Sequence, residues 1–397
     1  MSYSKKIIFM VSSPFYLTDY DRFGIEKFLN KGYEVEICNI CPIIYPEFFS
    51  KSNRTDIYSG KLEKIFFKKQ KLIDYLNINK KNLFILKIHY NVYTHFIFKL
   101  ITDLNISYLF SIINIVPSNI ESTKTINYKK FLNFKNINQI FFNKVLGSMK
   151  KIFQKIKAPN YLIVGGLKSL QSPQASIIDK STKLIWTHTY DFDKYLYSCK
   201  KKDDDRIDFI KKKFAVFIDA PSPLIKHDAL IPGISSPLTS DIYFPRLCNF
   251  FDEIEKNLNM KVIIASHPKS NHLDTPEYYG GRRVYKNMTV DLIKKSKLVI
   301  NRNSTAINFA ILFSKPIMFH TSNQILSHAV MSKQINSMAR LLKKTPINID
   351  VLENINWNNQ LKINKDLYKN YYNQYIKNPK SKYLYLWDIV ISELENE

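Results

Sequence analysis

The segment from Lys261 to Phe319 decides the fold. It reads KVIIASHPKS at 261–270, GGRR at 280–283, KLVINRNST at 297–305 and KPIMF at 315–319. The apolar runs 262–265 and 298–300 are each followed by a polar turn, a pattern typical of buried parallel strands. Because the carboxyl ends of parallel strands meet at one edge of a sheet, we expect the His-Pro turn and the Ser-Thr turn to lie at that edge, where they could cradle an anion.

The rest of the chain predicts an α/β protein with two Rossmann-like domains. A strand at 6–12, a helix at 21–31 and a strand at 34–40 form a βαβ opening that lacks G-x-G-x-x-G, which disfavours a dinucleotide site of the usual type. Segment 71–157 reads as mostly helical. Further strands are expected at 62–67, 161–166 and 184–188, and in the second half at 214–218, 262–265, 284–285, 298–300 and 317–319; further helices are expected at 244–257, 289–296 and 305–313.

The charged run 200–213 is the best linker candidate, since a fresh apolar strand begins at Phe214. We therefore predict a first domain over 1–205, a second over 206–365, and C-terminal helices over 366–397 that pack back towards the first domain. Ligands of such open sheets bind beyond the carboxyl ends of the strands, so a cleft between the two domains is the expected site.

Composition limits the function only loosely. The chain has 397 residues, 45% hydrophobic residues and a formal net charge of +25. Nucleic acid, an anionic membrane and acidic substrates all fit this charge, but lysines scattered in twos and threes favour solvated helix faces over a nucleic-acid arm. Four cysteines, of which Cys38 and Cys41 form a single C-x-x-C, make neither a disulfide framework nor a zinc ribbon. No secretory signal and no run of about 20 apolar residues is present, so we expect a cytoplasmic protein.

Three groups of residues in the second domain suit an anionic ligand. The turn His267-Pro268-Lys269 would aim an imidazole from a strand end; an ordinary turn histidine is the alternative. The turn Asn303-Ser304-Thr305 precedes an apolar helix, where it could bind a phosphate or simply cap the helix. The guanidinium of Arg282, after a Gly-Gly pair, could contact a phosphate or lie in solvent.

Carboxylates at strand ends are candidates for a general base. Asp219 ends the strand that begins at Phe214, and His227 follows it in the same block. Asp191 and its neighbour Asp193 come after the last strand of the first domain, and Asp19 with Asp21 follows the first strand. We predict catalytic roles for Asp219, His227 and Asp191, and sequence alone leaves the choice of base among these carboxylates open.

The segment 214–322 resembles the second domain of GT-B glycosyltransferases from bacterial surface-polysaccharide loci. Its strand–His-Pro and strand–Ser/Thr–helix pair is similar to that of sialyltransferases and Kdo transferases, which use CMP-activated acidic sugars. The resemblance implies that His267 contacts the donor phosphate and that Ser304 and Thr305 hold the same phosphate. Asn303-Ser304-Thr305 stands where the family has Ser-Ser, and the family's acidic motif is not found here.

The resemblance therefore implies a GT-B glycosyltransferase that moves a sugar, preferably from a CMP donor and without a metal or other cofactor, onto a surface glycan such as capsule, O-antigen or lipooligosaccharide. Its expected partners are a nucleotide sugar and a glycan or lipid-linked acceptor, and it could dock peripherally at the inner membrane. The alternatives are a sugar-nucleotide epimerase of the same architecture, and a nucleic-acid- or membrane-binding protein driven by charge.

Overall fold

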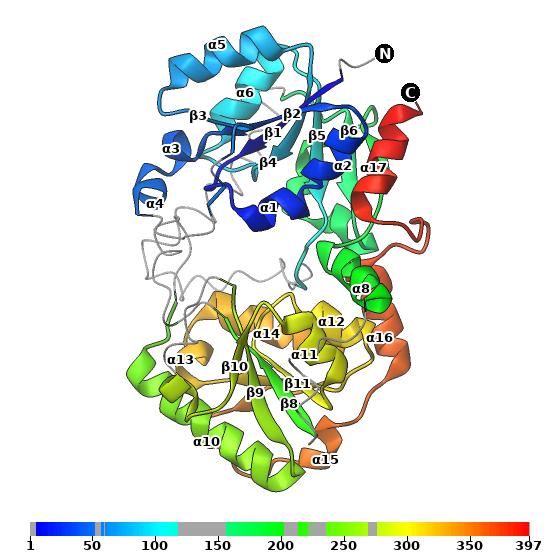
Figure 1. Ribbon diagram of the computed structural model, residues 1–397. Coiled ribbons are helices and arrows are strands. Elements are labelled where there is room, and N and C mark those ends of the chain that lie inside the picture. The colour runs from blue at the N-terminus through cyan, green and yellow to red at the C-terminus, as the bar shows by residue number, and fades with distance from the viewer. Residues whose placement is uncertain are drawn as a thin grey trace, which may run out of the picture.

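The computed structural model describes residues 5–51, 57–58, 60–117, 156–201, 213–220, 223, 236–268 and 276–396. It contains two parallel β-sheets, each covered by helices on both faces, one above the other in Figure 1. The two-domain α/β architecture is as predicted. None of the described helices combines the length and apolar character needed to cross a bilayer.

The first sheet has the strand order β3-β2-β1-β4-β5-β6-β7. Its strands are β1 (Lys6–Val11), β2 (Glu34–Asn39), β3 (Glu63–Ile65), β4 (Leu83–Lys87), β5 (Tyr108–Ile112), β6 (Tyr161–Val164) and β7 (Lys183–Trp186). One face packs under α5 (Lys69–Asn79) and α6 (His95–Asp103), and the other under α1 (Leu17–Arg22), α2 (Ile25–Asn30) and α17 (Leu386–Glu395). Two short helices, α3 (Cys41–Ile44) and α4 (Pro46–Ser50), follow β2.

The second sheet has the order β10-β9-β8-β11-β12-β13. Its strands are β8 (Phe214–Ile218), β9 (Lys261–Ser266), β10 (Val284–Lys286), β11 (Leu298–Asn301), β12 (Ile317–Thr321) and β13 (Ile347–Asn348). The helices of this half are α10 (Ser240–Leu258), α11 (Thr289–Lys295), α12 (Ile307–Leu312), α13 (Asn323–Leu326), α14 (Ala329–Leu341), α15 (Trp357–Gln360) and α16 (Lys365–Tyr371), with a π-helical turn at Tyr372–Ile376.

Two sequence predictions were wrong. Segment 71–157 was predicted as mostly helical, yet β4 and β5 lie within its described part at the centre of the first sheet, and residues 118–155 of this segment lie outside the described residues. The helix predicted at 21–31 is split into α1 and α2 because Gly24, at φ +63°, turns the chain between them. Gly32, predicted to end this helix, does follow it and has φ +78°.

In each sheet there is one point from which successive strands of the chain are added in opposite directions. In the first sheet this switch lies between β1 and β4, and in the second between β8 and β11. Loops that leave neighbouring strands at such a point run to opposite faces and leave a crevice beyond the carboxyl ends of the strands, where ligands bind in open α/β sheets.

The chain passes between the domains in two segments that lie side by side. Thr187, His188 and Thr189 join β7 to α8 (Tyr190–Lys200), and residues 376–386 return from the second domain to α17. The Thr189 amide donates to the Ile376 carbonyl at 2.9 Å, and His188 pairs with Lys377 as an antiparallel bridge.

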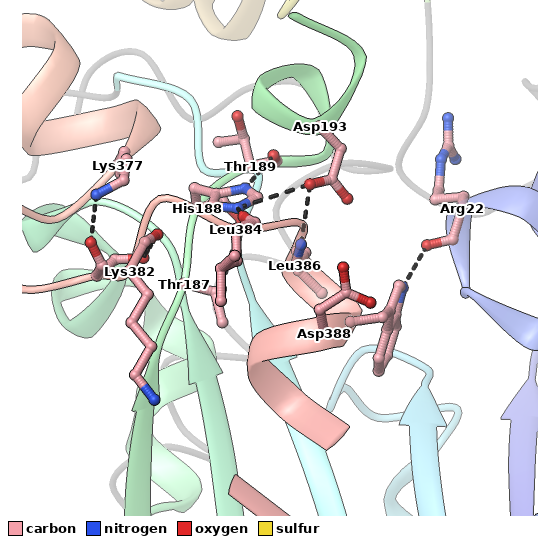
Figure 2. Close-up of polar contacts among 12 residues, drawn as sticks. Arg22, Thr187, His188, Thr189, Asp193, Lys377, Lys382, Leu384, Leu386 and Asp388 are labelled. Carbon is pink, nitrogen blue, oxygen red and sulfur yellow. Dashed lines mark hydrogen bonds and ion pairs between the residues drawn. The ribbon is translucent and has the colours of Figure 1, made fainter. Parts of the chain in front are cut away.

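Side chains strengthen this crossing, as Figure 2 shows. The buried imidazole of His188 has Nδ1 3.0 Å from the Thr189 carbonyl and Nε2 2.8 Å from the Leu384 carbonyl. The Leu386 amide donates to Asp193 at 2.9 Å, and the indole of the buried Trp387 donates to the Arg22 carbonyl at 2.7 Å. Asp193 is therefore committed to the crossing, where burial raises the pKa of its carboxyl to about 7.

Candidate active site

Asp219 fixes the backbone of the His-Pro turn. One carboxylate oxygen of this buried residue accepts a hydrogen bond from the His267 backbone N–H at 3.1 Å, and the other accepts from the Tyr279 hydroxyl at 2.9 Å. Tyr279 is fully buried, and its pKa is raised first by burial and then by the Asp219 charge. His267 remains partly exposed and Pro268 exposed. This geometry makes Asp219 a positioning residue for the turn.

The Ser-Thr turn begins where β11 ends. The buried Asn301 side chain accepts from the Ser304 amide at 3.2 Å, and the Ser304 hydroxyl accepts from the Ala306 amide at 3.2 Å. Asn303 donates to Gln334 at 3.3 Å. Helix α12 therefore starts at Ile307, two residues after the predicted start at Thr305, because the turn is stabilised by these side chains before the helix begins.

The strand register shows that the two turns are neighbours. Ile218 of β8 pairs with Ala265 of β9, and Phe217 pairs with Ile300 of β11. The polar residues that follow β9 and β11 therefore lie at nearly the same level along the strand direction. One strand separates them, which corresponds to about 10 Å at the usual spacing between strands.

Arg282 lies away from these turns. It precedes β10, and its guanidinium donates to Asp252 at 2.6 Å and to Glu255 at 3.1 Å, both on α10. The same group lies over the Phe251 ring, with Cζ 5.2 Å from the centroid. Because two carboxylates of the domain already compensate its charge, Arg282 holds α10 against the sheet and is not part of the proposed anion site. His227 and Lys269 lie outside the described residues.

Asp191 lies just after the crossing, on α8, whose Phe192 and Leu196 pack in the core of the second domain. It lies in the first turn of α8, and its Oδ2 accepts a hydrogen bond of 2.8 Å from Nδ2 of Asn308, a buried residue of α12. The Asn308 backbone amide in turn donates to the Thr305 carbonyl at 3.0 Å. The carboxylate therefore lies close to the Ser-Thr turn. Burial raises the pKa of Asp191, while the Asn308 hydrogen bond acts in the opposite direction.

The other candidate carboxylates differ from Asp191 in their partners. Asp19 accepts from the Tyr16 amide at 3.2 Å and lies 3.5 Å from the Arg22 guanidinium, so it stabilises its own helix turn. Asp21 is exposed beside it, and Asp193 belongs to the crossing.

A lysine at the switch point of the first sheet was missed from the sequence. Lys87 ends β4, and its ammonium donates to the Tyr190 hydroxyl at 2.7 Å and to the Ser111 hydroxyl at 3.1 Å. The ammonium also makes cation–π contacts with three aromatic rings. Its Nζ lies 5.0 Å from the ring centroid of Trp387, 5.1 Å from that of Phe23 and 5.4 Å from that of Tyr190. Burial lowers its pKa to about 7, with a smaller contribution from Arg22. The sequence signal that could have identified Lys87 is a single lysine at the end of an apolar run.

A second missed group lies beside the Ser-Thr turn. The buried Arg302 has its guanidinium carbon 5.5 Å from the Tyr243 ring centroid, and the Tyr243 hydroxyl lies 3.0 Å from Nε2 of His320. Burial, and then the Arg302 charge, lowers the pKa of His320 to about 3, so this imidazole is neutral at physiological pH. Arg302 thus supplies a fixed positive charge at the same sheet edge as His267 and Ser304.

Comparisons with known proteins agree with the fold. No family model matches the sequence, and no curated protein sequence matches it. Among solved structures, the chain is similar to S. aureus MnaA with UDP (TM-score 0.52, 13% identity, 99% of this chain and 97% of that chain). It is also similar to a putative UDP-N-acetylglucosamine 2-epimerase from Listeria monocytogenes (TM-score 0.51, 11% identity, 99% and 98%) and to the wall teichoic acid polymerase TagF (TM-score 0.54, 14% identity, 99% and 90%). The predicted GT-B fold, with two Rossmann-like domains, is confirmed.

Proposed function

We propose that the protein is a nucleotide-sugar-dependent glycosyltransferase whose donor binds at the switch point of the second sheet. The observation that carries this proposal is the hydrogen bond between Asp219 and the His267 amide, which fixes a histidine turn one strand away from the Ser304 turn. Arg302 adds positive charge at the same edge. A phosphate between the two turns would meet hydroxyl, imidazole and backbone donors in a partly desolvated crevice, where such groups stabilise negative charge strongly.

The proposed chemistry is a direct displacement at the anomeric carbon of the donor sugar. The acceptor hydroxyl oxygen forms the new bond to that carbon while the bond from the carbon to the phosphate oxygen breaks. Asp191 takes the hydroxyl proton, and the departing nucleotide keeps the electron pair of the broken bond. Through His267, Ser304 and Thr305 the second domain stabilises the charge that develops on this leaving group.

Asp191 is our choice of base because of its contacts. Asn308 engages its Oδ2 and orients the carboxylate, and partial burial raises its pKa towards the range in which a base works best at neutral pH. Asp219 and Asp19 each have both carboxylate oxygens engaged by protein groups. Asp219 accordingly acts through the position of His267, and not by direct proton transfer.

We propose a CMP-linked acidic sugar as the donor, on the basis of the resemblance of the two turns to CMP-using transferases. The likeness to a structure determined with UDP makes UDP the competing nucleotide. The acceptor, a glycan or lipid-linked glycan, would occupy the crevice of the first sheet between β1 and β4, beside Lys87 and Arg22.

Calorimetric titration of CMP, UDP and GDP into the wild-type protein tests the donor site. We expect tightest binding for CMP and at least about 10-fold weaker binding in His267→Ala and Ser304→Ala, the loss that one charge-assisted hydrogen bond commonly causes. The matched control is Ser327→Ala, which removes an exposed hydroxyl after α13. Unchanged affinity in both site variants would refute the donor-site assignment.

A sugar-nucleotide 2-epimerase is the second candidate. It is favoured by the likeness to the Listeria protein, which is matched over 98% of its length. Incubation with a nucleotide sugar in the absence of acceptor separates the two functions. An epimerase yields an isomeric nucleotide sugar without other substrates, whereas the proposed transferase yields a glycoside only when an acceptor hydroxyl is supplied.

A further inference from the structure

The imidazole of His188 lies between two backbone carbonyls at the crossing between the domains. Nδ1 lies 3.0 Å from the Thr189 carbonyl oxygen, and Nε2 lies 2.8 Å from the Leu384 carbonyl oxygen. Because a carbonyl oxygen only accepts hydrogen bonds, both contacts are favourable only when both ring nitrogens carry a proton. A neutral ring would turn the lone pair of one nitrogen towards a carbonyl oxygen. These surroundings therefore favour the imidazolium form of His188.

Asp193 supplies the opposite charge beside this ring (Figure 2). Its Oδ1 lies 3.6 Å from Nε2 of His188 and accepts a hydrogen bond of 2.9 Å from the Leu386 amide. The imidazole is fully buried, whereas 23% of the Asp193 side chain is exposed. Solvent can therefore exchange a proton with the pair through the carboxyl group.

Burial acts against separate charges on this pair. It lowers the pKa of His188, an effect that the two carbonyls oppose and the Lys377 charge strengthens. It also raises the pKa of Asp193 to about 7. Because opposite charges 3.6 Å apart compensate each other, the two groups titrate as coupled sites that share one proton near neutral pH. The two carbonyls favour the ring as the place of that proton.

Other charged groups near the pair largely balance each other. Lys27 of α2 lowers the pKa of Asp193 and Asp388 of α17 raises it, and these two residues form an ion pair of 2.6 Å. The Tyr190 hydroxyl, in the first turn of α8, stays protonated at neutral pH because burial raises its pKa, with a smaller contribution from the Asp193 charge. Among these groups, His188 and Asp193 are the ones that titrate near neutral pH.

We infer that His188 and Asp193 form a proton-dependent tie between the two chain segments that connect the domains. With the shared proton in place, the ring donates to Thr189 in the outgoing segment and to Leu384 in the returning segment. Once the proton is lost, one ring nitrogen faces a carbonyl oxygen without a hydrogen between them, and the segments separate more readily. The tie therefore loosens as the pH rises through neutrality.

The direction of this pH effect follows from where the proton is held more tightly. When the crossing is open, the imidazole loses its proton near the ordinary pKa of 6.5, whereas the intact pair keeps one proton up to an apparent pKa of about 7. Between these values the intact crossing binds more protons than the open one, so its stability falls as the pH rises. The corresponding change in the opening equilibrium is about threefold.

The tie lies at the start of the helix that carries Asp191. Helix α8 begins directly after Thr189 and packs on the second domain through Phe192 and Leu196. A looser crossing would free the first domain to change its position relative to Asp191, so pH would act on the arrangement of the domains. The tie does not depend on the proposed reaction, and each can fail without the other.

Hydrogen exchange of the full-length protein, resolved to single amides by fragmentation in a mass spectrometer, tests the tie. The amides of Thr189 and Leu386 donate across the two segments, so their protection reports its opening. After correction for intrinsic exchange rates, we expect this protection to fall about threefold from pH 6 to pH 8.5 in the wild type. In Asp193→Asn and His188→Gln the pH dependence should disappear.

Nitrogen NMR of protein labelled with 15N-histidine tests the protonation state directly. At pH 6 both ring nitrogens of His188, identified by the loss of their signals in His188→Gln, should have the chemical shifts of N–H groups. The matched controls are His89→Gln, which removes a histidine that follows β4, and Asp191→Asn. Both should keep the wild-type pH dependence of exchange. A neutral ring at pH 6, constant protection in the wild type, or loss of the pH dependence in either control would overturn the inference.

Discussion

The carboxylate of Asp191 and the side-chain amide of Asn308, separated by 117 residues in the chain, are joined by a hydrogen bond of 2.8 Å. This bond links the helix that leaves the first sheet to the helix that follows the Ser-Thr turn of the second. It places an oriented carboxylate close to the proposed donor phosphate.

Replacing Asp191 by Asn should abolish proton transfer and spare donor binding. We expect kcat to fall by about 100-fold or more, which is the usual contribution of a positioned base, while the calorimetric Kd for the donor nucleotide stays within about twofold. Asn308→Ala removes a donor that lowers the pKa of Asp191, so the acidic limb of the kcat profile should move to higher pH. Wild-type turnover in Asp191→Asn would transfer the role to another carboxylate.

Tyr279→Phe should loosen the His-Pro turn through Asp219. The variant removes a buried hydrogen bond to a carboxylate, which commonly contributes about 1.5–3 kcal/mol to the free energy of unfolding. Urea denaturation should show a loss of this size, and the Kd of the donor nucleotide should increase. Tyr278→Phe, at the partly buried neighbouring position, should change neither quantity. Equal effects of the two variants would show that Asp219 does not depend on the Tyr279 hydroxyl.

The contribution of Lys87 to the free energy of unfolding should increase as the pH rises above 7. Its pKa is about 7 in the folded state against 10.5 for an ordinary lysine, so between these values the unfolded chain binds more protons than the folded one. Its contribution to the free energy of unfolding therefore increases with pH across that window, and is lowest below pH 7. Chemical denaturation of wild type and Lys87→Met from pH 7 to pH 9.5, stopping short of tyrosine ionisation, should show a steeper rise of the free energy of unfolding with pH in the wild type than in the variant.

Gly24 and Gly32 offer a matched pair that tests how α17 is held. Both have positive φ, but a Cβ on Gly24 would overlap the indole ring of Trp387, whereas one on Gly32 would meet nothing within 4 Å. Gly32→Ala should cost about 1 kcal/mol of unfolding free energy through backbone strain alone. Gly24→Ala should cost about 1–3 kcal/mol more because the ring must shift. Equal Tm losses in thermal unfolding would mean that the Trp387 contact is unimportant.

Sequence patterns predicted the second domain better than the first. The strands predicted in that half, such as the apolar run Phe214–Ile218, are confirmed, although the two-residue strand β13 (Ile347–Asn348) was missed. In the first domain, β4 and β5 lie before and after α6, and the helical periodicity of α5 and α6 hides them. Lys87 also interrupts what would otherwise be a clear apolar run, although it is the residue that marks the end of β4.

The candidate site could be predicted only where its residues come from strand ends. His267 and Ser304 follow β9 and β11, and parallel pairing brings them together. Tyr279, Arg302 and Asn308 could not be predicted because their roles depend on which side chains meet across the fold, and sequence spacing carries no information on that. Arg282 illustrates the converse, since its compensation by Asp252 and Glu255 on α10 cannot be read from the Gly-Gly-Arg-Arg motif.

The paired crossing at His188 and Lys377 limits how the domains can move. Two adjacent, hydrogen-bonded segments bend together about an axis across their width, but twisting one domain against the other would stretch one segment and compress the other. Hinge bending of one domain towards the other is therefore the motion that this crossing should permit most easily. Because Asp191 lies on α8, which packs on the second domain, each closure should return the first domain to the same position over Asp191 and the proposed donor site. The backbone at the crossing would thus make the closed geometry reproducible.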